Sequence, residues 1–215
     1  MNNHSRTVVT ASIALTVAAL LSACGAVGAA GAGRVEPAAA SARGGLVYGP
    51  GPQATYVVQA QPAKGSCHYR WVGTKPLPDP ACTPGTLSPA VKQENIRTTI
   101  CRAGYEAGIR PPLKVTTPEK KGSAAAYSFS GVWARAEYDH NVPLALGGDP
   151  NDARNLWIEP NDLATPGATP SGNGKDRAEY TLYRAVCRKT NPIPLAVAQA
   201  AIAADWTTAV KVAGA

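Results

Sequence analysis

The chain has 215 residues and a formal net charge of +7, with 21 glycines, 19 prolines and five cysteines. This length leaves room for one compact domain once targeting and linker segments are set aside, and so excludes a large multidomain protein. The basic balance favours an anionic partner, such as nucleic acid or a phospholipid surface, although many exported proteins are also basic.

Residues 1–23 are typical of a signal peptide. A start with one arginine and no acid leads into an uncharged run of 17 residues, which ends in Leu21-Ser22-Ala23 before Cys24. The run is short for a membrane span, and no basic stop follows it. Leu-Ser-Ala-Cys resembles a bacterial lipobox, which implies cleavage before Cys24 and lipidation of its thiol. The alternative is an ordinary secretory signal with an incidental cysteine.

Residues 24–62 are rich in Ala, Gly and Pro and have few apolar anchors. Such a segment cannot bury enough surface to offset its chain entropy, so we expect a flexible tether. The folded domain is then expected over residues 63–215, anchored to the membrane by its lipid.

Four cysteines remain after Cys24, an even number that suggests two disulfides in an exported chain. Of the three possible pairings we favour Cys67–Cys82, which closes a proline-rich loop, and Cys101–Cys187, which joins two predicted helices. A four-cysteine zinc site is the weaker alternative because the chain contains no CxxC pair.

The first half of the domain shows few regular elements. Residues 67–85 carry four prolines and two cysteines and predict a disulfide-held loop or short hairpin. Ser88 and Pro89 are typical of a helix start, and that helix would end near Cys101. Pro111-Pro112 predicts an extended segment over residues 109–115, and residues 117–124 are expected to form a solvated loop.

The second half predicts a strand, a long turn, a strand, a loop and two helices. The strands are expected at residues 136–142 and 155–160, separated by the turn residues of GGDPND. The helices are expected at residues 175–187 and from Pro194 to about Val210, each with an apolar face. The predicted fold class is therefore α+β: a small disulfide-bonded domain around a ββα unit, with additional helices.

Residues within this ββα unit resemble the HNH (ββα-metal) nuclease superfamily. The resemblance is carried by Asp139-His140, Gly147-Gly148, Asn155-Leu156-Trp157 and Asn173-x-Lys175-Asp176. More narrowly, the chain is similar to exported actinobacterial HNH-like lipoproteins with a DHxxPLxLGG…NLWxEP…KD pattern. Asn95-Ile96, Thr99-Ile100-Cys101, Gly104-Tyr105 and Arg110-Pro111-Pro112 extend the similarity upstream.

The chemistry of phosphodiester hydrolysis assigns roles to these residues. His140 is the candidate general base, since a histidine can accept a proton from water near neutral pH. Asn155, by resemblance, braces the turn and orients His140. Lys175 and Arg177 lie at a helix N-terminus, where phosphate is favoured.

Asp139 and Asn173 are the candidate metal ligands. Both offer oxygen atoms, so Mg²⁺ or Mn²⁺ is expected in preference to Zn²⁺, which favours nitrogen and sulfur. Asn161 is the alternative to Asn173, because the 18-residue gap between Asn155 and Asn173 is longer than in compact HNH motifs.

The sequence therefore predicts a monomeric, metal-dependent, non-specific endonuclease acting on DNA or RNA at the outer side of the cell membrane. The alternative is a lipoprotein with the same fold and weak or no activity that binds nucleic acid, envelope polymer or a protein partner. Ala145 favours this alternative, because related sequences often carry an acid at that position.

Overall fold

The computed structural model describes residues 45–161 and 173–214. The predicted signal peptide, Cys24 and most of the predicted tether lie outside these residues. So does nearly all of the loop expected between the second strand and the helix that follows it.

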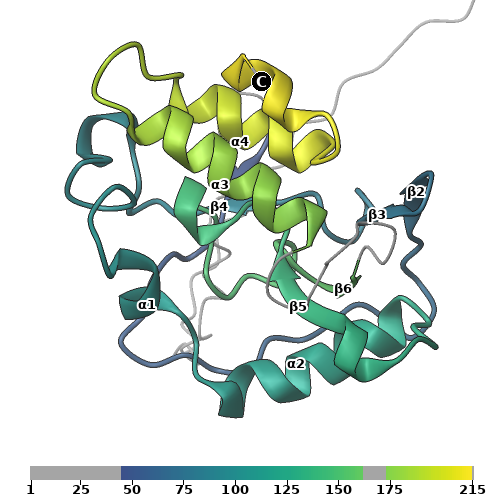
Figure 1. Ribbon diagram of the computed structural model, residues 1–215. Coiled ribbons are helices and arrows are strands. Elements are labelled where there is room, and N and C mark those ends of the chain that lie inside the picture. The colour runs from purple at the N-terminus through teal and green to yellow at the C-terminus, as the bar shows by residue number, and fades with distance from the viewer. Residues whose placement is uncertain (1–44, 162–172, 215) are drawn as a thin grey trace, which may run out of the picture. The chain divides into compact units, whose positions relative to one another are not determined.

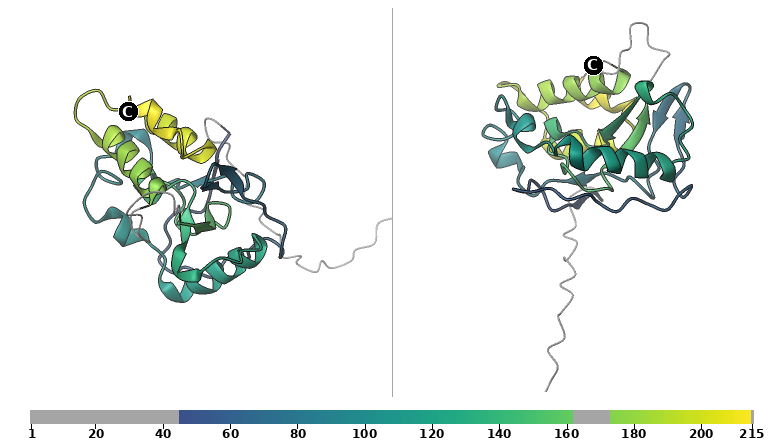
Figure 2. Two further views of the ribbon diagram at one scale, coloured as in Figure 1. Left: turned by 45° about the vertical axis from the view of Figure 1, so that its right-hand side comes forward. Right: turned by 90° about the horizontal axis from the view of Figure 1, so that it is seen from below.

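The described chain is a mixed α+β fold whose strands form three two-stranded sheets. The central pair joins β5 (Ala136–His140) and β6 (Leu156–Pro160), antiparallel, with Glu137 opposite Glu159 and His140 opposite Leu156. Figures 1 and 2 show this pair between α2 (Leu113–Ala126) and the helices α3 (Gly174–Cys187) and α4 (Leu195–Ala204). The two predicted strands and both predicted helices are confirmed, with the last helix ending earlier than expected.

Two apolar clusters lie against the β5–β6 unit. The larger cluster gathers α3, α4 and the β5–β6 connection, with Val142, Leu146, Leu182 and Ile202 fully buried. The smaller cluster contains Trp157 and Ile158 of β6, Ala136 of β5, and Tyr127 just after α2. Burial of this apolar surface is the main stabilising contribution to such a fold.

The folded domain begins earlier than the sequence indicates, which corrects the predicted boundary at residue 62. Leu46 is buried in the larger cluster, and β1 (Val47–Tyr48) pairs in parallel with β4 (Thr86–Leu87). Further along, the amide of Gln59 donates a hydrogen bond to the Glu119 carboxylate at 2.7 Å. Residues 46–62 show no periodic apolar pattern, and main-chain hydrogen bonds such as that from the Gly49 amide to the Leu87 carbonyl at 2.9 Å hold them to the domain.

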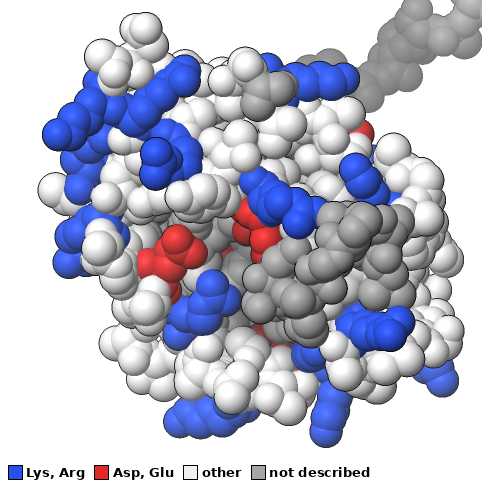
Figure 3. All heavy atoms as spheres, in the orientation of Figure 1, with Lys and Arg blue, Asp and Glu red and all other residues white. Residues whose placement is uncertain are grey.

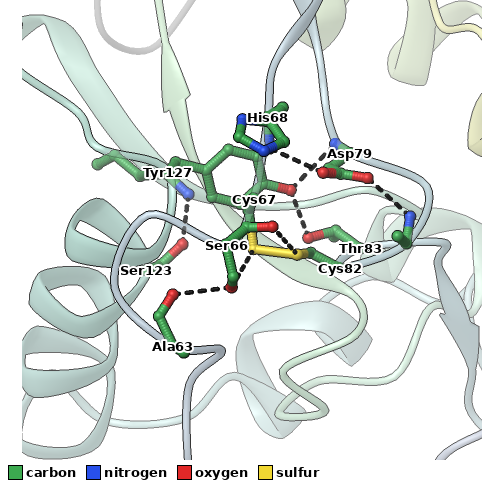
Figure 4. Close-up of a disulfide and its surroundings, with 11 residues drawn as sticks. Ala63, Ser66, Cys67, His68, Asp79, Cys82, Thr83, Ser123 and Tyr127 are labelled. Carbon is green, nitrogen blue, oxygen red and sulfur yellow. Dashed lines mark hydrogen bonds between the residues drawn. A yellow bond between two sulfur atoms is a disulfide. The ribbon is translucent and has the colours of Figure 1, made fainter.

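The predicted disulfide-held hairpin is confirmed. Strands β2 (Arg70–Val72) and β3 (Lys75–Leu77) are antiparallel, and Cys67 is bonded to Cys82 beside them. Figure 4 shows the bridge next to Tyr127, whose hydroxyl lies 2.8 Å from that of Thr83. The rings of Tyr69, Tyr127 and Trp157 pack together here and cover a loop that has little apolar surface of its own.

The second disulfide also forms as expected, between Cys101 and Cys187 at the end of α3. The segment leading to Cys101 contains only a 3₁₀ turn at Gln93–Asn95, so the helix predicted from Ser88 is wrong. Ser88 is fully buried, and its amide bonds to the Gly147 carbonyl at 2.9 Å, which takes the chain out of helical geometry.

Helix α2 replaces the solvated loop predicted for residues 117–124. Pro118 lies inside the helix, and a proline there forfeits a main-chain hydrogen bond. Tertiary contacts outweigh that loss, because Val115, Glu119 and Ser123 are buried and the Ser123 hydroxyl accepts a hydrogen bond from the amide of Ile158. The other helix is the short α1 (Tyr105–Ile109). Among the described residues, no helix is both long and apolar enough to cross a bilayer.

Candidate functional site

A buried lysine joins the start of α3 to the end of β5. Lys175 has 1% of its side chain exposed, and its ammonium donates to the carboxylates of Asp139 and Glu179. It also donates to the main-chain carbonyl of His140 at 2.8 Å and lies 4.0 Å from the Glu159 carboxylate. One cation therefore lies among three carboxyl groups contributed by β5, β6 and α3.

Strand and helix periodicity places these groups together. Opposed residues of an antiparallel pair share a sheet face, as do residues two apart on one strand, so Glu137, Asp139 and Glu159 share the face of β5–β6 that Lys175 meets. On α3, Lys175 and Glu179 are one turn apart. The helix is positioned by a capping box, in which the Asn173 side chain accepts from the Asp176 amide at 3.0 Å.

Burial and mutual charge set the ionisation of this cluster. Burial acts to raise the pKa of Asp139, but Lys175 holds that pKa below its ordinary value. Burial acts to lower the pKa of Lys175, but the surrounding carboxylates hold it well above its ordinary value. Burial, together with the charge of Asp139, raises the pKa of Glu159 well above normal and that of Glu179 to about 8. Asp139 and Lys175 are thus the charged pair at neutral pH.

His140 is buried, and its ring is held by the main chain of the β5–β6 connection. Its Nε2 lies 3.1 Å from the carbonyl oxygen of Pro150. A carbonyl only accepts, so Nε2 carries the proton and Nδ1 keeps a free lone pair. Burial lowers the pKa of His140 to about 4, against the opposing effect of the Asp139 charge. The ring is therefore neutral near pH 7, with Nδ1 unprotonated.

Asn155 braces the connection between the strands. Its side-chain oxygen accepts from the amides of Val142 (2.9 Å) and Thr86 (3.3 Å). Its amide nitrogen donates to the carbonyls of Val142 (3.0 Å) and Asp149 (2.9 Å). A Cβ at Gly148 would lie 1.8 Å from the Val142 carbonyl oxygen, so only glycine allows this close approach. The turn that presents His140 is therefore fixed by one fully buried amide and one glycine.

Asn173 and Asn161, the two candidates for a metal ligand beside Asp139, occupy different positions. Asn173 is buried, its side-chain oxygen caps α3, and its amide nitrogen donates to Glu137 at 3.3 Å. Asn161 follows β6 directly, and its side-chain oxygen is buried without a hydrogen-bond partner among the described residues. Helix capping occupies one lone pair of the Asn173 oxygen and leaves a second lone pair available.

The expectation that Lys175 binds phosphate is corrected by its surroundings. Its ammonium is buried against carboxylates, so it is shielded from an incoming anion. Arg177 is exposed on another face of α3, where it lines a surface pocket with Lys75 and Trp206. The two residues therefore do not form a joint phosphate site at the helix N-terminus.

Sequence reasoning missed that Glu137, Glu159 and Glu179 surround Lys175. The alternation of Glu137 and Asp139 along a strand, and the one-turn spacing of Lys175 and Glu179, were the available signals. A pocket of about 490 Å³ opens beside this cluster and is lined by Asp176, Glu179 and Ala145.

The carboxyl groups around Lys175 are oxygen donors of the kind that bind a divalent cation. Within residues 45–161 and 173–214, no three His, Cys, Asp or Glu side chains are arranged to hold a metal. Mg²⁺, however, usually takes only one or two carboxylates and keeps several waters. Asp139, with 24% of its side chain exposed, supplies an ionised oxygen donor of this kind. Glu159, whose two oxygens accept no hydrogen bond from the described residues, would supply a second donor on losing its proton. The chemistry of these residues fits a magnesium-like ion.

The chain matches no protein-family model, no curated protein and no solved structure.

Proposed function

We propose that this protein hydrolyses phosphodiester bonds of nucleic acid, as an HNH-like endonuclease with His140 as general base. The observation that carries the proposal is the state of His140: buried, neutral, oriented through Nε2 by the Pro150 carbonyl, and following a charged Asp139. The order β5, connection, β6, α3 agrees with the ββα resemblance in the sequence. The basic net charge of +7 suits an anionic polymer.

The residues of this chain contribute orientation and proton transfer. Nδ1 of His140 accepts a proton from water as that water attacks phosphorus, a step that general-base catalysis accelerates by about 10²–10⁴-fold. Asn155 keeps the connection in place, so the His140 ring does not turn away. Lys175 fixes the Asp139 carboxylate and, through the His140 carbonyl, the end of β5.

We propose Mg²⁺ or Mn²⁺ as the cofactor, in preference to Zn²⁺. Asp139 would hold the ion, together with Glu159 or the second lone pair of the Asn173 oxygen. When bound, such an ion would polarise the phosphate and stabilise the leaving oxygen. The oxygen-only donor set supports this choice of metal.

Plasmid and oligonucleotide cleavage by the full-length chain, in Mg²⁺ or Mn²⁺ against EDTA, tests the proposal. We expect cutting that EDTA abolishes and that His140→Ala reduces by about 10²–10⁴-fold. His68→Ala is the matched control, because His68 is exposed beside the Cys67–Cys82 bridge and far along the chain from β5. Equal cutting by wild type and His140→Ala would refute the site.

A second candidate function is binding without catalysis, to nucleic acid, envelope polymer or a protein partner. The observation that favours it is Lys175, which already provides a cation among the carboxylates. An inactive wild type that still binds nucleic acid in EDTA would identify this function.

We also propose that the protein acts as a monomer, exported and anchored through Cys24 at the outer face of the membrane. The two disulfides support an oxidising compartment. Cys24→Ser should move the protein from the membrane fraction to the soluble exported fraction, and retention at the membrane would contradict the anchor.

A further inference from the structure

A basic pocket lies along the C-terminal half of α3. It has a volume of about 850 Å³ and is lined by the cationic side chains Arg97, Arg184, Arg188 and Lys189. No Asp or Glu among the described residues lines it. An anion would meet four positive groups and no opposing charge in this pocket.

The pocket walls are fixed in place. The guanidinium of Arg97 donates to the main-chain carbonyls of Cys187 (2.5 Å) and Arg188 (2.9 Å). The Cys101–Cys187 disulfide ties the same end of α3 to the segment before α1. A pre-formed pocket binds its ligand without the cost of ordering its walls.

Two tyrosines continue the pocket along α3. Tyr180 is 60% exposed, and Arg184 lies over its ring, 5.9 Å from the centroid. Tyr183 is one turn further on, 6.4 Å from Tyr180 between ring centroids. Exposed aromatic rings beside arginines are the usual platform on which unpaired bases stack.

The basic pocket adjoins the candidate active site. Tyr180 and Tyr183 also line the neighbouring pocket, which reaches Asp176 and Glu179, and Glu179 contacts Lys175. The two pockets share these tyrosines and together form a groove along α3. This groove runs from acidic residues near the site to basic residues at the far end. Figure 3 shows blue side chains gathered at the upper left, over the C-terminal part of α3, and red ones nearer the middle of the same face.

The distance between the two ends suits a nucleic-acid strand. Lys175 and Arg188 are 13 residues apart, which spans about 20 Å along a helix. A strand within a duplex rises about 3.4 Å per nucleotide and an unpaired strand can extend further, so such a span contacts at most about six nucleotides of one strand.

We propose that this groove binds single-stranded nucleic acid, with Arg184 and Arg188 on backbone phosphates and an unpaired base stacked on Tyr180. The inference rests on the proposed function in taking nucleic acid as the ligand, and it adds the strandedness of that ligand. A duplex keeps its base faces stacked within the helix, so it offers the phosphates without the contact to Tyr180.

Fluorescence anisotropy in EDTA tests the groove with a labelled oligothymidylate and a duplex of equal length. For the single strand we expect Tyr180→Ala to weaken binding by about 5- to 150-fold, the range for loss of one stacked base. The double variant Arg184→Gln/Arg188→Gln should also bind more weakly, with a slope of log affinity against log salt smaller by about 1.4. The full-length chain is used throughout.

Lys114→Gln/Lys121→Gln is the matched control, because it removes two exposed charges from α2 on the other side of β5–β6. It should bind as tightly as the wild type. Equal losses in both double variants, or no change in Tyr180→Ala, would overturn the groove. Wild-type binding with these dependences but no cutting in Mg²⁺ or Mn²⁺ would leave the groove supported and refute the nuclease.

Discussion

The ammonium of Lys175 donates a hydrogen bond of 2.8 Å to the main-chain carbonyl of His140. The first turn of α3 is thereby fixed to the last residue of β5, across 35 residues of sequence. The same ammonium contacts Asp139 and Glu179, so the residue that positions the strand end also balances the charge of Asp139.

Replacing Lys175 by methionine should destabilise the fold by about 3–5 kcal/mol at neutral pH. The loss arises because removing one partner of a buried ion pair leaves uncompensated charge, here on Asp139. Urea denaturation measures the change. Lys121→Met, an exposed change on α2, should stay within about 0.5 kcal/mol of wild type. A loss for Lys175→Met no larger than for Lys121→Met would show that the cluster is not a net source of stability.

Gly148→Ala should destabilise the protein by more than about 3 kcal/mol. A Cβ there would meet the Val142 carbonyl oxygen at 1.8 Å and the Asn155 side-chain nitrogen at 2.8 Å, so the connection must move apart. Gly108→Ala in α1 is the control, since nothing lies within 4 Å of its Cβ. That change should raise stability by about 0.4–1 kcal/mol by restricting the unfolded chain. Thermal unfolding measures both variants. A Gly148→Ala protein more stable than Gly108→Ala would contradict the packing described for the turn.

The two disulfides should contribute unequally. Cys101 and Cys187 are separated by 86 residues and Cys67 and Cys82 by 15. From loop-closure entropy, we expect the free energy of unfolding to fall by about 4.6 kcal/mol when Cys101 and Cys187 are replaced by alanines. Replacing Cys67 and Cys82 should lower it by about 3 kcal/mol. Denaturant unfolding of both double variants checks the order, and a larger loss at Cys67–Cys82 would show that packing around the hairpin outweighs loop length.

Glu119 should make stability fall as the pH rises from acid. Its carboxylate is buried and accepts the Gln59 amide on one oxygen, while burial raises its pKa above the ordinary 4.5. Above pH 4.5 the folded chain therefore retains a proton that the unfolded chain has released, and this lowers the free energy of unfolding.

Glu119→Gln should remove that dependence. The free energy of unfolding of Glu119→Gln minus that of wild type should be larger at neutral pH than at pH 4.5. Urea denaturation at both pH values measures this difference. Glu94→Gln, an exposed change in the segment before Cys101, is the control. A relative stability of Glu119→Gln that declines with pH would show that the carboxylate is stabilised as an anion.

Local signals in the sequence were sufficient for the elements that carry the candidate site. The Gly-Gly turn separates β5 from β6, and the capping pair Asn173 and Asp176 defines the start of α3. Helix α2 could not be predicted in the same way, because Pro118 and Gly122 disfavour a helix and tertiary contacts with β6 and with the segment at Gln59 stabilise it. Local propensity is a weak guide wherever tertiary contacts decide.

In the candidate site, too, some features follow from local sequence and others depend on tertiary contacts. Asp139 and His140 stand out because they are adjacent polar residues at a strand end. The ring of His140 is oriented by the backbone carbonyl of Pro150. Every residue has a backbone carbonyl, so the sequence does not reveal this contact. The burial of Lys175 was also missed, because a lysine at a helix N-terminus looks exposed until the strands that cover it are placed.

The two apolar clusters that flank β5 and β6 have a consequence for how activity would fail. Ala136 and Trp157 belong to one cluster, while Val142 and Leu182 belong to the other, so His140 lies along the chain between residues of the two clusters. If either cluster unfolds locally, the packing on one side of His140 is lost. Under the proposed function, cutting should therefore be lost when the first of the two clusters opens, before the chain as a whole unfolds. Native-state hydrogen exchange at β5 would report that opening directly.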